Sequence, residues 1–172
     1  MKMKPSSWHV SVAAEAIAAG QFARCGFDVS VQYGANQPEY DLIVAKDRRL
    51  LKVSVKGSQE GGWGLTQSFL ESANYHGAID KWLHRHDPET IFCFVEFKKV
   101  PLTELPRMYL ARPCEVAQRL HETAKGRGDT ILYEKHIWGT RAIGAGTIEQ
   151  IPQEWLFSQS RIEQLLETIM VT

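Results

Sequence analysis

The chain has 172 residues, 44% of them hydrophobic and 23% charged, which favours a single domain around one core. Lys plus Arg and Asp plus Glu number 20 each, so the net charge argues neither for nor against a nucleic-acid partner. No run approaches the roughly 20 apolar residues of a membrane span, and no signal peptide is evident after Met1, so we expect a soluble cytoplasmic protein.

The first half of the chain predicts a helix followed by three strands. The helix covers about residues 8–25 and ends at Gly26. The residues expected to share its apolar arc are Val12, Ala16, Ala19, Phe22 and Ala23. Alternating hydrophobic and polar residues predict strands at 28–32, 40–45 and 49–56. The segment between the last two strands is short enough to form a hairpin turn.

The second half predicts further helices and strands. We expect a loop at 57–64, helices at 65–84 and 113–124, and strands at 90–98, 108–110 and 130–138. The last helix is expected to begin at Ser160, because Ser160 and Glu163 fit a capping box. Its apolar stripe contains Ile162, Leu165 and Leu166. These elements predict a mixed α/β domain with a hairpin at its centre.

The hairpin places three polar side chains together. If its turn consists of two residues, Asp41 lies opposite Ser54, and such cross-strand neighbours share one face of the sheet. Lys56 follows Ser54 by two residues and therefore lies on the same face. We thus expect Asp41, Ser54 and Lys56 to converge at the open end of the hairpin. A register shift of one residue would break this convergence.

Glu15 falls inside the expected apolar arc of the first helix. A carboxylate on a packed face is costly unless it is paired or bound to a metal ion. The alternative is a glutamate at the flank of the helix that forms a salt bridge. The helical wheel alone does not separate these two interpretations.

These residues, in this order, resemble the PD-(D/E)XK nuclease superfamily, the restriction-endonuclease-like fold that Holliday-junction resolvases share. The matching segments are Ala14-Glu15-Ala16, Pro38-Glu39-Tyr40-Asp41 and Val53-Ser54-Val55-Lys56-Gly57-Ser58. The resemblance implies an αβββαβ core at about residues 8–100, with a central mixed sheet flanked by helices. A C-terminal α/β extension at about 101–172 would complete the single domain.

The resemblance also implies a chemistry, the hydrolysis of phosphodiester bonds in DNA with Mg²⁺ or Mn²⁺. Asp41 would be a metal ligand, Glu15 an auxiliary ligand, and Lys56 the cation that orients a water molecule. Mg²⁺ prefers hard oxygen ligands and keeps several waters, which suits such a site. Members of this superfamily often act as dimers, so the resemblance allows a homodimer.

Ser54 departs from the superfamily pattern, because it stands where an acidic residue is usual. A neutral hydroxyl is a weaker ligand for Mg²⁺ than a carboxylate. Glu15 would then supply the second carboxylate, or Glu39 or Glu60 would do so. Alternatively the site is inactive, and the fold binds nucleic acid or a protein without cutting. A third interpretation is an unrelated α/β protein in which Asp41 and Lys56 form an ordinary surface pair.

Three further residues are candidates for contacts with DNA. Lys52 belongs to a strip of basic residues along the hairpin, of the kind that phosphates favour. Gln59 and Trp63 lie in the expected loop beside the active end of the hairpin. The alternative for these two residues is an ordinary surface loop.

Overall fold

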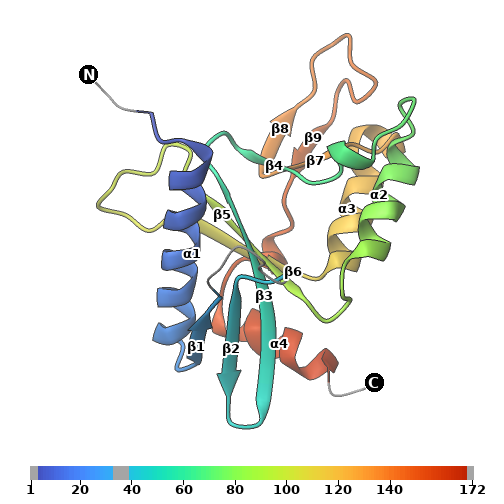
Figure 1. Ribbon diagram of the computed structural model, residues 1–172. Coiled ribbons are helices and arrows are strands. Elements are labelled where there is room, and N and C mark those ends of the chain that lie inside the picture. Colours follow the sequence, from blue (N-terminus) through green and yellow to red (C-terminus); the bar gives the residue numbers. More distant parts are fainter. Residues whose placement is uncertain (1–3, 33–38, 170–172) are drawn as a thin grey trace.

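The computed structural model describes residues 4–32 and 39–169 (Figure 1). The helices are α1 (Ser7–Arg24), α2 (Tyr75–Arg85), α3 (Pro113–Gly126) and α4 (Gln159–Ile169), with short 3₁₀ turns at Gln67–Phe69 and Gln153–Trp155. The strands are β1 (Asp28–Val31), β2 (Leu42–Lys46), β3 (Arg49–Ser58), β4 (Gly62–Gly64), β5 (Ile91–Glu96), β6 (Arg107–Ala111), β7 (Ile131–Tyr133), β8 (Lys135–Ile137) and β9 (Ile148–Gln150).

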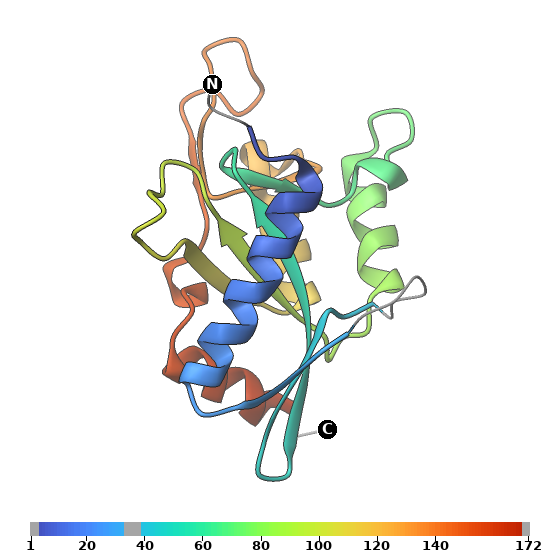
Figure 2. The same cartoon turned by 60° about the vertical axis from the view of Figure 1, so that its left-hand side comes forward.

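A mixed five-stranded sheet forms the centre of the fold, in the order β1-β2-β3-β5-β6. Neighbouring strands are antiparallel except for β3 and β5, which run parallel and are connected through α2. Helices cover both faces of this sheet (Figures 1 and 2). The expected α/β class and the central mixed sheet flanked by helices are therefore confirmed. Two further pairs of short strands, β4 with β7 and β8 with β9, lie outside the central sheet.

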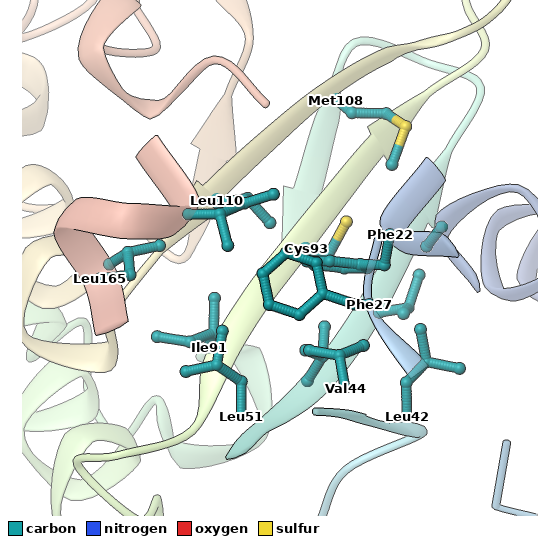
Figure 3. Packing of buried hydrophobic residues seen from close by; sticks show 14 of the residues in the cluster. Phe22, Phe27, Leu42, Val44, Leu51, Ile91, Cys93, Met108, Leu110 and Leu165 are labelled. Atoms are coloured by element: carbon teal, nitrogen blue, oxygen red, sulfur yellow. The ribbon is translucent and has the colours of Figure 1, made fainter. Parts of the chain in front are cut away.

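The two faces of the central sheet bury separate apolar clusters. Alternate residues of β3, β5 and β6 point to opposite faces, as the pleat of a strand requires. One face packs against α1 and α4, and Figure 3 shows this cluster around Phe22, Val44 and Leu51. The opposite face packs against α2 and α3 and is rich in aromatic rings, including those of Phe92 and Phe94. Strand β6 and helix α4 thus contribute to the packing of the central sheet although they follow residue 100.

The hairpin of β2 and β3 forms as predicted. Lys46 pairs with Arg49, and the register continues to the pair of Leu42 with Val53. The turn therefore consists of Asp47 and Arg48. Asp47 has a φ of 58°, in the left-handed region that aspartate tolerates better than most residues.

Helix α1 forms over nearly the predicted range but presents a different face to the sheet. Its buried residues are Val10, Ala14, Ala18 and Phe22. Of the predicted arc, Phe22 is buried, whereas Val12 is 46% exposed and Ala16 is also exposed. Small side chains at positions 14 and 18 let the helix approach the sheet closely, and an alanine-rich sequence gives little signal for choosing between its faces. The predicted arc is therefore wrong for most of its members.

The segment from 57 to 84 differs from the prediction. Strand β3 continues to Ser58, and Gly62–Gly64 forms β4 in place of the expected loop. Helix α2 begins at Tyr75 and not at 65, because the Asn74 side chain caps it by accepting a hydrogen bond from the Gly77 N–H.

Two boundaries near the C-terminus also differ from the prediction. The expected strand at 130–138 divides into β7 and β8 at Glu134, whose carboxylate binds the Arg107 guanidinium. Helix α4 begins at Gln159, and the Ser158 hydroxyl accepts a hydrogen bond from the Arg161 N–H. Ser158 therefore occupies the capping position that the sequence assigned to Ser160.

Candidate functional site

An open cleft of about 600 Å³ lies between the N-terminal half of α1 and the ends of β3 and β4. It contains three of the predicted site residues, Glu15 from α1, Asp41 from the residue before β2, and Lys56 from β3. The other lining residues include Ser7, Ser11, Val55, Gly57, Gln59, Glu60 and Trp63. The cleft therefore brings Glu15 together with the hairpin residues Asp41 and Lys56, to which the sequence had related it only through their order.

Asp41 is held where the ladder between β2 and β3 ends. Its backbone N–H donates to the Val53 carbonyl at 2.8 Å. Its carboxylate Oδ2 accepts a hydrogen bond from the Val55 N–H at 2.6 Å. The side chain thus satisfies a backbone donor of β3 and fixes its own position at the wall of the cleft.

Ser54 does not join Asp41 and Lys56 in the cleft. It is 1% exposed, lies beside Phe92 of β5, and is not among the residues that line the cleft. The expected convergence fails at this position because the paired register stops at Leu42 and Val53. Asp41 folds across the end of the ladder, and so it is not a regular partner of Ser54.

Glu15 is half-buried beside the packed stripe of α1. Burial raises the pKa of its carboxyl group, the negative charge of Asp41 raises it further, and the Lys56 ammonium partly offsets both. Among the residues that the structure describes, Glu15 forms no ion pair. The helix-flank salt bridge considered from the sequence is therefore not found there.

Lys56 brings positive charge to the same cleft. Within residues 4–32 and 39–169, its ammonium forms no ion pair with a carboxylate. The side chain also lines a second hollow of about 580 Å³, next to Gly64, Leu65, Arg85 and His86. Lys56 therefore stands where the two hollows meet, available to an anion in either.

The donor set fits one divalent cation with an incomplete protein shell. Glu15 and Asp41 provide hard carboxylate oxygens, and the mutual repulsion of these groups would be relieved by a cation between them. In the described part of the chain, no three His, Cys, Asp or Glu side chains are arranged to hold a metal. Mg²⁺ commonly binds one or two carboxylates and fills its remaining positions with water and substrate phosphate.

Comparison with solved structures finds a similar fold in an endonuclease. The chain is similar to a bacterial homing endonuclease, I-Ssp6803I, with a TM-score of 0.51 and 13% sequence identity over 98% of both chains. The chain has a nuclease-like fold. Neither the models of known protein families nor the sequences of curated proteins match it. No helix within the described residues is long and apolar enough to cross a membrane.

The predicted contacts with DNA occupy different environments in this nuclease-like fold. Lys52 pairs with Asp87 at 3.0 Å on the surface. Gln59 lines the cleft and donates to the Pro5 carbonyl at 3.2 Å. Trp63 is 3% exposed and packs against Phe94, with ring centroids 5.1 Å apart. The ring of Trp63 thus belongs to the core, because β4 turns it inward, and it is not presented to solvent as the predicted loop would require.

Glu60 and Glu39, the two alternative acids, lie in different hollows. Glu60 lines the cleft, where it forms an exposed ion pair with Lys4 at 3.0 Å. Glu39 lies at the second hollow and accepts hydrogen bonds from the Asp87 N–H. Pro38, which precedes Glu39 in the motif, lies outside the described residues. Glu15 is thus the carboxylate that shares the cleft with Asp41 and, unlike Glu60, has no cationic partner among the described residues.

The second hollow was not predicted from the sequence. His86 lies there, with its ring 4.5 Å from that of Trp82 and 5.2 Å from that of Phe92, measured between centroids. An aromatic residue four positions before His86 on a predicted helix was the only sequence signal for this arrangement. The contact with Phe92 depends on the sheet and could not be found from local spacing.

Proposed function

We propose that the protein is a metal-dependent endonuclease that hydrolyses phosphodiester bonds in DNA. The observation that carries the proposal is the cleft in which Glu15, Asp41 and Lys56 meet without a neutralising ion pair among the described residues. The fold supports it, since a similar solved structure is that of an endonuclease. The proposed ion is Mg²⁺ or Mn²⁺, and the proposed substrate is DNA.

In this proposal the chain positions the reacting groups. Asp41, fixed by the Val55 N–H, and Glu15 would hold the cation from two sides of the cleft. Lys56 would orient a water molecule or bind a phosphate oxygen, because its ammonium is free of carboxylate partners in the described chain. The bound cation would acidify a coordinated water and neutralise negative charge that builds on the phosphate.

A second candidate is a nuclease-fold module that binds nucleic acid or a protein and does not cut. The observation that favours it is Ser54, which is neutral, buried and absent from the cleft. Among the described residues of the cleft, Glu15 and Asp41 are then the two carboxylates without a cationic partner that remain for a cation. This candidate predicts binding that is indifferent to Mg²⁺.

The first test is cleavage of supercoiled plasmid and of labelled duplexes and branched DNA in Mg²⁺, Mn²⁺ or EDTA. Asp41→Asn and Lys56→Met should each lower the rate at least about 100-fold, because each removes a group from the reacting centre. Glu104→Gln, on the exposed turn between β5 and β6, is the matched control and should cut like wild type.

Two results decide between the candidates. Cleavage by Asp41→Asn at the wild-type rate would refute the assigned site. If wild type cuts none of the substrates in either metal but binds them equally with and without Mg²⁺, the non-catalytic candidate is correct. Isothermal titration of Mn²⁺ into wild type and Asp41→Asn supplies an independent measure of the cation site.

A further inference from the structure

A series of hollows extends from the candidate site across β4 to the opposite side. A hollow of about 330 Å³ shares Glu60, Gly62 and Gly64 with the Glu15–Asp41 cleft. It also shares Gly61, Lys98, Lys135 and His136 with another hollow, of about 530 Å³, beside the turn after β5. Adjoining hollows therefore lead from the cleft, past β4, toward the hairpin of β8 and β9, at the top of Figure 1, and we call this series of hollows the groove.

The far end of this groove carries an excess of positive charge. Lys98, Lys99 and Lys135 line it, and no carboxylate in the described residues pairs with any of them. The Lys98 ammonium donates to the backbone carbonyl of Glu60, which leaves its charge in place. Of the other charged side chains there, Arg107 and Glu134 pair at 2.6 Å, and the buried Glu96 carboxylate accepts hydrogen bonds from the Gly61 and Lys98 N–H groups. Three lysines therefore face one carboxylate that has no cationic partner among the described residues. We call Lys98, Lys99 and Lys135 the basic track.

We propose that the basic track binds the phosphodiester backbone of DNA on one side of the bond that is cut. This inference rests on the proposed function for the choice of ligand. A ligand in the groove must satisfy three lysines at one end and a pair of carboxylates at the other. The closely spaced phosphates of a DNA backbone meet the first requirement without a metal ion, and with a bound divalent cation they also meet the second. The sparser carboxylates of an acidic protein surface would bind the three lysines less strongly.

Substitution of Glu60 is expected to change DNA binding in the opposite direction from substitution of the track lysines. Glu60 lines the groove between the cleft and the basic track, and its cationic partner among the described residues is Lys4, in an exposed ion pair. Exposed pairs of this kind are weak. A backbone following the groove passes Glu60, so Glu60→Gln should tighten binding while loss of track lysines weakens it.

The experiment measures binding without cleavage. Fluorescence anisotropy with a labelled duplex of about 30 base pairs, three helical turns, is recorded in EDTA over a range of salt concentrations. The variant Lys99→Ala/Lys135→Ala removes two track charges and keeps Lys98, which supports the backbone at Glu60. The matched control, Arg24→Ala/Arg48→Ala, removes two exposed charges from the end of α1 and from the β2–β3 turn, at the opposite end of the molecule (Figure 1).

The logarithm of the association constant falls linearly with the logarithm of the salt concentration, and each lost phosphate contact makes this slope shallower by about 0.9 for duplex DNA. The track variant should therefore lose about 1.8 from the slope and bind about 60-fold more weakly at about 0.1 M salt. The control should keep the wild-type slope.

The outcomes separate the inference from the proposed function. An unchanged slope in Lys99→Ala/Lys135→Ala, or no binding by wild type, overturns the basic track even if cleavage is observed. The predicted loss of slope supports the track even if no metal activates cleavage, in which case the proposed endonuclease activity alone fails. Equal binding of an acidic peptide and the duplex at the same salt would also overturn the assignment to DNA.

Discussion

The contact between α1 and β3 predicts opposite effects for two glycine substitutions. A Cβ atom on Gly57 would lie 2.9 Å from Val10 Cγ1, 2.9 Å from the Val10 carbonyl oxygen and 3.0 Å from Ala14 Cβ. The carbonyl belongs to the helix backbone, so the clash cannot be relieved by rotating a side chain. Helix α1 must move away from the sheet, and overpacking of this kind costs about 1–3 kcal/mol.

Gly20 provides the matched control on the same helix. A Cβ atom there meets nothing within 4 Å, and the residue is exposed. Alanine is a better helix former than glycine, so Gly20→Ala should stabilise the fold by about 0.5–1 kcal/mol. Thermal unfolding followed by circular dichroism measures both variants, because about 1 kcal/mol shifts the Tm of a chain of this size by about 2–4 °C.

The same displacement also affects the candidate site. Glu15 lies on α1, whereas Lys56 lies on β3 next to Gly57. Gly57→Ala should therefore lower the Tm and weaken Mn²⁺ binding in isothermal titration, whereas Gly20→Ala should raise the Tm and leave Mn²⁺ binding unchanged. A Gly57→Ala protein as stable as wild type would refute the close packing of α1 on β3.

Three more predictions concern charge and burial. Burial and a neighbouring carboxylate raise the pKa of Glu15 above the ordinary glutamate pKa of 4.5. The ionised form of Glu15 therefore destabilises the fold as the pH rises above 4.5. Glu15→Gln should thus resist urea better than wild type at about pH 7 but not at about pH 4, and an equal advantage at both would contradict this. Glu134→Ala should lower the free energy of unfolding in urea by about 1–3 kcal/mol, because Arg107 loses its carboxylate partner; no change would show that this pair is not formed. A thiol reagent should label exposed Cys114 rapidly and Cys93 only after unfolding, since burial raises the pKa of Cys93; rapid labelling of Cys93 would contradict its burial.

The hairpin was predictable because its signal is local. Alternation over Arg49–Lys56 has the period of a strand, and three residues between two such runs leave room only for a turn. The register of β2 and β3 followed from that turn and is confirmed through the pair of Leu42 with Val53. The position of Asp41 and Lys56 in one cleft is consistent with this register.

The face of α1 and the start of α2 were not predictable for different reasons. Alanines lie on several sides of α1, so hydrophobicity separates its faces poorly, and the buried side is the one that approaches Gly57 closely. Residues 65–74 contain good helix formers, but Ser72 and Ala73 adopt positive φ and Asn74 caps the later helix. Both outcomes depend on tertiary packing or backbone geometry that a single sequence does not express.

The position of Ser54 was not predicted correctly, because the pairing of β2 with β3 ends before it reaches Ser54. Opposite residues share a face only while the ladder continues, and this ladder ends at the pair of Leu42 with Val53, so that Asp41 lies just outside it. Beyond that point the Asp41 carboxylate binds the Val55 N–H, while Ser54 remains beside Phe92 with 1% exposure. Because Ser54 does not line the cleft, it adds neither a metal ligand nor a charge there, and the charge of the cleft depends on the residues that do line it.

The same geometry bears on how a nuclease site could lack the usual acidic residue. A carboxylate at position 54 would be buried beside an aromatic ring, where an unpaired charge is costly. Glu15 reaches the cleft from α1 instead, and its pKa is raised by burial and by Asp41, the condition that a bound cation relieves. In the proposed enzyme, the second carboxylate is therefore supplied by the helix, and its distance from Asp41 is set by the packing of α1 against Gly57.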